Sequence, residues 1–193
     1  MVTKKQNYHH GDLRQALTQA ALSVLKEEGI TKISLRSIAR KAGVSQAAPY
    51  SHFPDKNALL VEVAAEGFET FHKALREPSP KSAQQADLKG YLFKLGIAYV
   101  RFALENKPLF QLMFGDALSD IPKSERYMQE GQAAYAVIEK AVQRVSTDPG
   151  APLAAWSVVH GLATLMVDGK IPVTKDLEQQ VIDVLKFQSF VKG

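Results

Sequence analysis

The stretch SLRSIARKAGVSQAAPYSHF, residues 34–53, has the spacing of a helix-turn-helix. Ser34 can cap a first short helix, whose apolar face contains Leu35, Ile38, Ala39 and Ala42. Two steeply crossing helices need a small residue where they approach each other, and Ala39 stands there. Four positions later, Gly43 tolerates the positive φ of a tight turn. Ser45 then caps a second short helix, so the stretch predicts two helices joined at Gly43.

The second helix has small or polar side chains on its predicted exposed face, namely Gln46, Ala47, Tyr50 and Ser51. Small side chains allow a helix to enter the major groove of DNA deeply, and a glutamine can form two hydrogen bonds with adenine. Pro49 interrupts this helix because it lacks a backbone N–H. As the fourth helical residue it removes one hydrogen bond, to the Ser45 carbonyl. We expect Pro49 to pack against Leu35 and Ala39 and to make no contact with a base.

The net charge of +4 is unevenly distributed along the chain. Residues 1–56 contain nine Lys or Arg against four Asp or Glu, a net +5, whereas the other residues contain 15 against 16, a net −1. A basic segment on a neutral body is typical of a protein that binds a polyanion at one end. A solvated basic surface is the alternative. Lys4 and Lys5 could likewise form an arm that reaches the DNA minor groove or a solvated tail.

The remaining sequence predicts an all-α fold. Apolar residues recur at spacings of three and four, and clean strand alternation is absent. The first helix is expected to start at Asp12 and to end at Gly29. After the two short helices capped by Ser34 and Ser45, further helices are expected near 54–77, 87–105, 108–114, 122–146, 151–168 and 174–191. A linker at 77–87 separates an N-terminal domain (1–56) and its connecting segment (57–86) from a C-terminal domain (87–193).

Composition and motifs exclude several classes of function. The 193 residues contain no cysteine, so disulfides and thiolate metal sites are impossible. The first ten residues are polar, which predicts neither a signal peptide nor a membrane span and places the chain in the cytoplasm. Gly-x-Ser-x-Gly, His-Glu-x-x-His and phosphate-loop motifs are absent. His9 and His10, next to Asp12, form only a weak metal motif. We predict no enzymatic activity, cofactor or metal.

The stretch LRSIARKAGVSQAAPYSHFPDKNALL, residues 35–60, resembles the DNA-binding head of the TetR family of transcriptional regulators. In that pattern a helix-turn-helix is followed by aromatic-x-x-Phe, a lysine and paired leucines. The resemblance covers about residues 12–70 and departs from the family at Pro49, where a large apolar residue is usual. YHHGDLR (8–14) and the Trp156-x-x-x-His160-Gly161 motif resemble the subgroup with a Trp-His-Gly type C-terminal domain. The family fold is all-α, with about nine helices, an N-terminal three-helix DNA-binding domain and a helical ligand-binding and dimerisation domain.

The resemblance implies roles for residues of the head. Tyr50 and Lys56 are expected to hold DNA phosphates, with Ser34 and Arg36 on the flanking backbone. Gln46 and Ala47 are the candidates for base contacts, and Ser51 is a weaker one. His52 is either a phosphate contact or a buried, hydrogen-bonded histidine. The predicted DNA-binding set is Ser34, Arg36, Ser45, Gln46, Ala47, Tyr50, Ser51, His52 and Lys56.

The C-terminal domain contains many aromatic and methionine side chains, some of which bring polar atoms into an apolar interior. The predicted ligand-binding set is Tyr99, Phe102, Phe110, Met113, Phe114, Tyr135, Trp156 and His160. Core packing is the alternative for each of them. The last two helices are the expected surface of a homodimer that binds a double-stranded DNA operator. In the family, a small-molecule effector releases the DNA. A nonspecific DNA-packaging protein and an enzyme are the competing functions.

Overall fold

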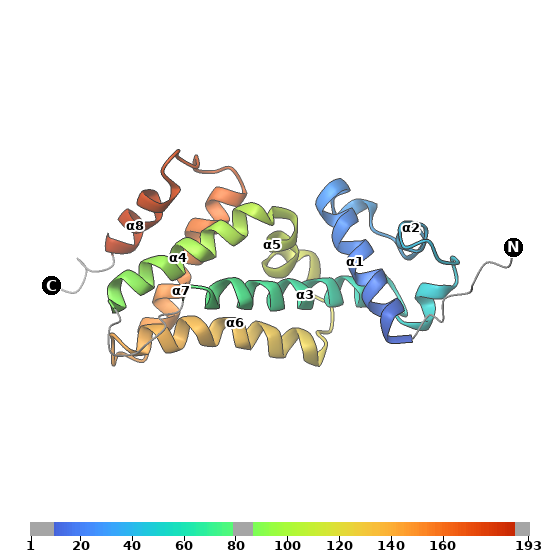
Figure 1. The fold of residues 1–193 in the computed structure, drawn as a ribbon, viewed down its shortest axis with the longest axis horizontal. Coiled ribbons are helices and arrows are strands. Elements are labelled where there is room, and N and C mark those ends of the chain that lie inside the picture. The colour runs from blue at the N-terminus through green and yellow to red at the C-terminus, as the bar shows by residue number, and fades with distance from the viewer. Residues whose placement is uncertain (1–9, 79–86, 188–193) are drawn as a thin grey trace, which may run out of the picture. The chain divides into compact units, whose positions relative to one another are not determined.

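The regular elements of the chain are helical throughout the residues that the structure, a computed structural model, describes: 10–78 and 87–187 (Figure 1). Side chains are described from Leu13 to Lys186. The α-helices are α1 (His10–Glu28), α2 (Leu35–Lys41), α3 (Lys56–Arg76), α4 (Leu88–Glu105), α5 (Lys107–Phe114), α6 (Glu125–Gln143), α7 (Ala151–Val167) and α8 (Leu177–Phe187). Three 3-10 helices accompany them: η1 (Ile30–Lys32), η2 (Ala48–Ser51) and η4 (Asp116–Leu118). The all-α class is confirmed, with eight α-helices in the described ranges against about nine helices expected.

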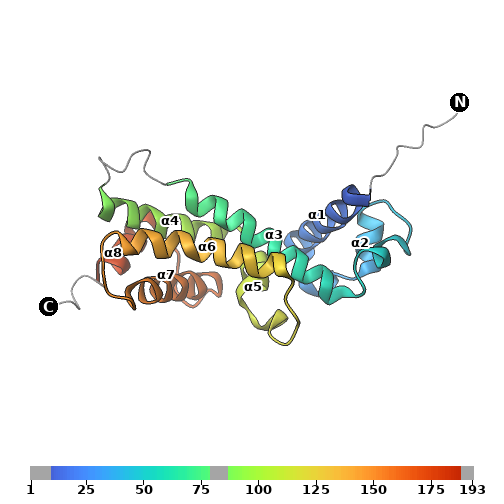
Figure 2. The ribbon, with the colours of Figure 1, turned by 90° about the horizontal axis from the view of Figure 1, so that it is seen from below.

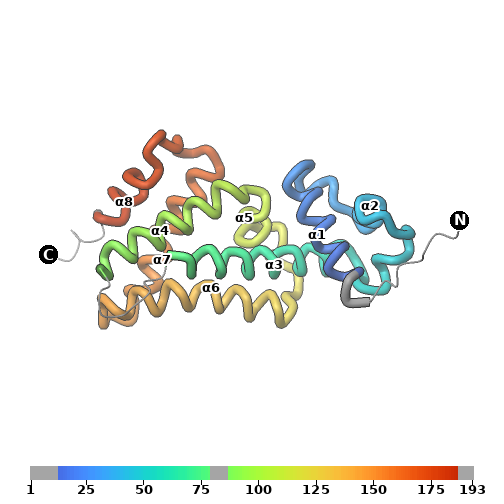
Figure 3. Tube along the Cα trace, in the orientation of Figure 1, coloured from blue at the N-terminus to red at the C-terminus, as the bar shows by residue number. Residues whose placement is uncertain are grey.

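The chain divides into two compact units, whose path can be followed in Figure 3. Unit 1 comprises Met1–Glu66 and Pro108–Tyr127, and unit 2 comprises Gly67–Lys107 and Met128–Gly193. Helices α3 and α6 each begin in unit 1 and end in unit 2. The predicted domain boundaries at residues 56 and 86 remain predictions, and most of the predicted linker lies outside the described residues.

In unit 1, α1 packs against η1 and α2, and α2 packs against η2. Helix α1 begins at His10, two residues before the predicted start, so Asp12 lies within its first turn. The predicted cap of α2 is confirmed, because the Ser34 side chain accepts a hydrogen bond from the Ser37 amide and the Ser37 hydroxyl accepts one from the Ser34 amide. The turn that follows α2 contains Gly43 with φ of 69°, the positive value that its position predicted.

A buried carboxylate connects three helices of unit 1. Glu62 of α3 is only 8% exposed, and it accepts hydrogen bonds from Arg14 of α1 at 2.5 Å and from Arg126 of α6. Arg126 also donates to Glu66 at 2.9 Å. Burial raises the pKa of Glu62, but its two arginine partners lower it by more, so the pKa lies below the ordinary glutamate value. The carboxylate is therefore ionised and paired at neutral pH.

In unit 2, α4 packs against both α7 and α8, and α7 also contacts α8 (Figure 2). The C-terminal part of α3 contributes Phe71, whose ring packs against the rings of Tyr99 and Phe102 at centroid distances of 4.8 Å. No helix in the described ranges combines the length and the apolar composition that crossing a lipid bilayer requires.

We expect Glu62→Gln to lower the free energy of unfolding at pH 7 by about 1–3 kcal/mol, because a neutral amide pairs weakly with two guanidinium groups. The native pKa of Glu62 is depressed, so its contribution is present at neutral pH and is lost as the pH falls below about 4. Urea unfolding at several pH values should show the gap between wild type and variant closing in acid.

The matched control is Glu69→Gln, which removes an exposed ion pair with Lys73 on the same helix. Surface pairs of this kind contribute about 0.5 kcal/mol. Equal losses in the two variants, or a gap for Glu62→Gln that stays constant with pH, would contradict the assignment.

Candidate functional site

The predicted second helix of the helix-turn-helix is the 3-10 helix η2, and Ala47 rather than Ser45 occupies its N-cap position. Pro49 explains the difference, because it cannot donate the α-helical hydrogen bond to the Ser45 carbonyl. That carbonyl instead accepts from the Ala48 amide at 3.1 Å, three residues on, and the Ala47 carbonyl accepts from the Tyr50 amide at 3.2 Å. The expectation of a helix capped by Ser45 is therefore corrected to a shorter and tighter element.

Pro49 itself is buried, and η2 packs against α2, whose buried residues include Leu35 and Ala39. The proline thus serves as the apolar contact of a segment that otherwise faces solvent. Pro49 therefore anchors the segment by burial, while the side chains of Ala47, Tyr50 and Ser51 stay exposed.

The predicted DNA-binding residues all lie in unit 1, on consecutive elements from the N-terminus of α2 to the first residue of α3. Seven of them are exposed, among them Tyr50 at 54%, and His52 and Lys56 are partly exposed. The exposed seven are Ser34, Arg36, Ser45, Gln46, Ala47, Tyr50 and Ser51. None of the nine is sealed beneath neighbouring side chains.

The side chains of Lys56 and Ser51 are also engaged in contacts within the chain. The Lys56 ammonium donates to the Ile30 carbonyl at 3.3 Å, which holds it beside η1 with further N–H donors available. The Ser51 hydroxyl donates to the Ala48 carbonyl at 2.7 Å, so toward a ligand it can only accept. Lys56 is the first residue of α3, and Asp55 caps that helix through a 2.8 Å hydrogen bond from the Ala58 amide.

The residue that sequence reasoning missed is Arg14. Its guanidinium donates to the His52 carbonyl at 3.0 Å, stacks 4.6 Å above the Phe53 ring and pairs with Glu62. It therefore fixes the backbone that leaves η2. Arg14 is the last residue of the YHHGDLR motif. From the sequence, its position in the first helix indicates only a polar residue beside the apolar face.

Unit 2 contains a cavity of about 720 Å³, within the usual size range of small-molecule sites. It is lined by Lys89, Leu92, Phe93, Leu95, Gly96, Tyr99, Ile138, Val142, Val145, Ser146, Ala151, Ala154, Ala155, Val158, Val159 and Leu185. Helices α4, α6 and α7 supply most of this wall, and α8 supplies Leu185.

Of the eight predicted ligand-binding residues, Tyr99 lines this cavity. Three others lie in unit 2 outside the lining, namely Tyr135, Trp156 and His160, and Phe102 is buried in the same unit. The remaining three, Phe110, Met113 and Phe114, belong to α5 in unit 1, where the rings of Phe110 and Phe114 pack at 4.9 Å. The eight predicted residues are therefore divided between the two units, and one of them lines the cavity.

The buried Tyr99 joins two of these residues, both partly buried, in a chain of polar contacts. Its hydroxyl accepts a hydrogen bond from Nε1 of Trp156 at 3.1 Å and lies 2.8 Å from Nδ1 of His160. Burial raises the pKa of Tyr99 well above its ordinary value and lowers the pKa of His160. Both groups are therefore neutral near pH 7, and the Tyr99 proton is available to the histidine nitrogen.

Residues suited to metal binding do not cluster in the described part of the chain, where no three His, Asp or Glu side chains are placed to hold an ion. The His9–His10 motif and the arm with Lys4 and Lys5 lie outside the residues whose side chains are described.

Two family models match this chain. The model of bacterial regulatory proteins of the tetR family matches residues 17–63, and that of the tetracyclin repressor-like C-terminal domain matches residues 92–185. The first covers the helix-turn-helix, and the second covers most of the cavity lining. The chain belongs to the TetR family, a family of regulators rather than enzymes. The Trp-His-Gly subgroup remains a prediction.

Similar proteins agree with this assignment. A solved structure of a protein with unknown function from Rhodococcus sp. RHA1 is 32% identical, covers 97% of this chain and 96% of its own, and superposes with a TM-score of 0.75. The nucleoid occlusion factor SlmA of Marinobacter nauticus is 31% identical over 58% of this chain and 56% of its own. The class C tetracycline repressor of Escherichia coli is 34% identical over 40% and 35%. The chain thus spans only part of the length of its curated relatives.

We expect Tyr99→Phe to lower the free energy of unfolding by about 1–3 kcal/mol, because it removes the hydroxyl that two partly buried nitrogen atoms share. Tyr135→Phe is the control, since the Tyr135 ring packs on Trp156 at 5.4 Å and the substitution keeps that ring. Urea unfolding followed by the fluorescence of Trp156, the single tryptophan, measures both variants. A Tyr99→Phe protein as stable as Tyr135→Phe would show that the polar chain contributes little.

Proposed function

We propose that this chain is a sequence-specific transcriptional regulator, a repressor that binds a palindromic DNA operator as a homodimer and leaves it when a small molecule enters the cavity of unit 2. The observation that carries the proposal is the exposed segment 45–51, anchored by the buried Pro49 and by Arg14 at its end. Residues 1–56 serve as the DNA-binding domain, 57–86 as the connection and 87–193 as the effector and dimerisation domain. Such a regulator works in the cytoplasm, where the operator is.

The proposed interface contains two kinds of DNA contact, those to base edges and those to phosphates. Gln46 and Ala47 precede η2 and are exposed, so they are the candidates for reading base edges in the major groove. Tyr50 and Lys56, with Ser34 and Arg36, hold the phosphates that set the position of the protein on the duplex. The net +5 charge of residues 1–56 supports contact with a polyanion.

The proposed dimer forms through α7 and α8. Leu153 and Leu165 of α7 are 57% and 46% exposed, unusual for leucines on a helix whose opposite side is buried. On the same helix, a Cβ atom added to Gly161 would meet no atom within 4 Å, so a second helix could approach there closely. Two copies packed through these helices would place two reading segments on one operator.

Helix α6 offers a route from the effector to the DNA-binding residues. Its first turn carries Arg126, bound to Glu62 and Glu66 of unit 1, and its last turns carry Ile138 and Val142, which line the cavity of unit 2. A ligand that shifts α6 would act on the Glu62 cluster and, through Arg14, on the backbone at His52. The ligand favours the released state only by its difference in affinity for the two states.

Lys56→Ala and Gln46→Ala should weaken DNA binding in different ways. Loss of the Lys56 ammonium should lower affinity about equally for all sequences and reduce the slope of log affinity against log salt by about one. Loss of the Gln46 amide should relax the preference at one or two base pairs and leave the salt slope unchanged. Selection from a random DNA pool, followed by salt titration on the selected site, measures both effects.

A loss of affinity in Lys56→Ala that is confined to one operator would contradict the phosphate contact of Lys56. An unchanged selected motif in Gln46→Ala would contradict the base contact of Gln46. The same selection separates the competing function, because a nonspecific DNA-packaging protein would enrich no motif. Circular dichroism of Lys56→Ala shows whether losing the hydrogen bond to the Ile30 carbonyl disturbs the fold.

For the dimer, we expect Leu165→Glu to yield monomers, because burying a carboxylate in an apolar interface without a partner is costly. Met128→Glu, on α6 and 49% exposed, is the matched control outside the proposed interface and should leave the oligomeric state unchanged. Sedimentation equilibrium of wild type and both variants gives the result. A Leu165→Glu protein with the wild-type mass would place the interface elsewhere.

A further inference from the structure

The cavity of unit 2 has an uneven distribution of polar groups. Thirteen of its sixteen lining residues carry no polar side-chain atom, and the other three are Lys89, Tyr99 and Ser146. Among the described residues that line the cavity, Lys89 is the one charged side chain and none is a carboxylate. An interior of this composition accepts an apolar molecule and provides one cationic contact.

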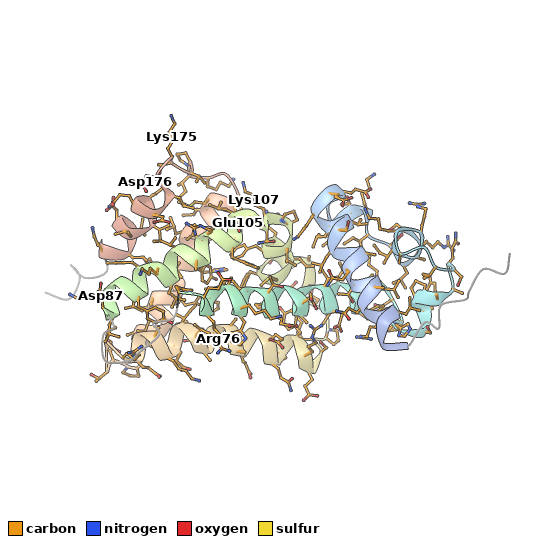
Figure 4. The ribbon with its side chains drawn as sticks, viewed as in Figure 1. Arg76, Asp87, Glu105, Lys107, Lys175 and Asp176 are labelled. Carbon is orange, nitrogen blue, oxygen red and sulfur yellow. The ribbon has the colours of Figure 1, made fainter. Side chains whose placement is uncertain are left out.

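The lining residues of α4 show where the charge lies relative to the apolar wall. Lys89, Leu92, Phe93, Gly96 and Tyr99 recur at helical spacing, so they form one stripe along the helix. Ten residues separate Lys89 from Tyr99, which is about 15 Å of helix. Lys89 stands in the first turn of α4, next to the capping residue Asp87 labelled in Figure 4, and Tyr99 stands in the second half of the helix. The cavity is therefore elongated, with its charge at one end.

The two ends of this stripe differ in what they can offer a ligand. At the far end, the Tyr99 hydroxyl already accepts a hydrogen bond from Trp156 and lies against His160. This end therefore offers a ligand mainly apolar contacts. At the near end, Lys89 is exposed and makes no ion pair among the described residues. A cation in the first turn opposes the helix dipole, so helix stability does not account for the lysine.

We propose that the effector is an elongated apolar molecule with a terminal carboxylate, of the class of medium-chain fatty acids, whose anionic group pairs with Lys89 and whose chain runs along α4 toward Tyr99. The inference rests on the proposed function only in calling this ligand the effector. The hydrocarbon chain gains from leaving water, and the pair with Lys89 selects an anion over a neutral or cationic compound of equal length.

The test uses decanoate, decanol and decylamine, which share one chain length and differ in the charge of the head group. The full chain is titrated with each compound, and binding is followed by the fluorescence of Trp156, which is hydrogen-bonded to the cavity residue Tyr99. We expect decanoate to bind the wild type at least about tenfold more tightly than decylamine, with decanol between them.

Three variants locate the interaction. Lys89→Gln should weaken decanoate about tenfold and leave decanol unchanged, because only the carboxylate uses the charge. Lys94→Gln, an exposed lysine of the same helix that does not line the cavity, should change neither. Ala155→Phe, which fills the cavity from α7, should weaken both compounds, with circular dichroism to verify that it folds.

Equal binding of decanoate and decylamine by the wild type would overturn the proposal, as would equal effects of Lys89→Gln and Lys94→Gln on decanoate. If decanoate still binds to a folded Ala155→Phe protein as tightly as to the wild type, the ligand site lies elsewhere, and this result would also overturn the proposal. These titrations contain no DNA, so their outcome is separate from that of the operator selection. Release of the selected DNA on addition of decanoate then tests whether this ligand is the effector of the proposed regulator.

Discussion

The ionised carboxylate of Glu62 is the constraint on which the head of this protein depends. A buried charge is tolerated only when it is paired, and Glu62 obtains its partners from two other helices, Arg14 of α1 and Arg126 of α6. Arg14 uses its remaining donors and its planar face on His52 and Phe53, the residues that follow η2. One carboxylate thus holds, through Arg14, the backbone at the end of segment 45–51 and, through Arg126, the start of the helix that contributes to the cavity wall.

Helical periodicity predicted most of the fold because burial follows it closely here. Leu35, Ile38 and Ala39, which were predicted to share one apolar face, are buried. Gly29, Gly43 and Ser34 stand at the helix ends and the turn where the sequence predicted them. The third helix differed for a reason already visible in the sequence. Pro49 removes one α-helical hydrogen bond, and in a segment only two turns long that loss is enough to favour 3-10 pairing at Ala48 and Tyr50. The sequence shows that Pro49 removes this hydrogen bond. It does not show that the loss changes the segment from an α-helix to a 3-10 helix.

The candidate sites were predictable to different degrees. Residues 45–51 follow one another in the chain, so a local motif was enough to predict that they form one exposed segment. A cavity is built from residues distant in sequence, and aromatic content was a poor guide to it. Large rings such as Phe71 and Phe102 fill space and form core, whereas the cavity remains where α7 presents Ala151, Ala154 and Ala155. Small residues on an apolar helix signal such a space only once the neighbouring helices are known.

The polar chain at Tyr99 shows why the charge of the cavity matters more than its hydroxyl. A phenol whose oxygen is engaged by both Trp156 and His160 presents mainly its ring to the cavity, and its raised pKa keeps it neutral. A ligand that bound the Tyr99 hydroxyl would displace it from Trp156 or His160, so the hydrogen bond gained would be offset by the one lost. Lys89 carries no such cost, because it faces solvent before a ligand arrives. In the proposed complex, selectivity for a charged head group would therefore come from the lysine end, and the position of Tyr99 would limit the length of the bound chain.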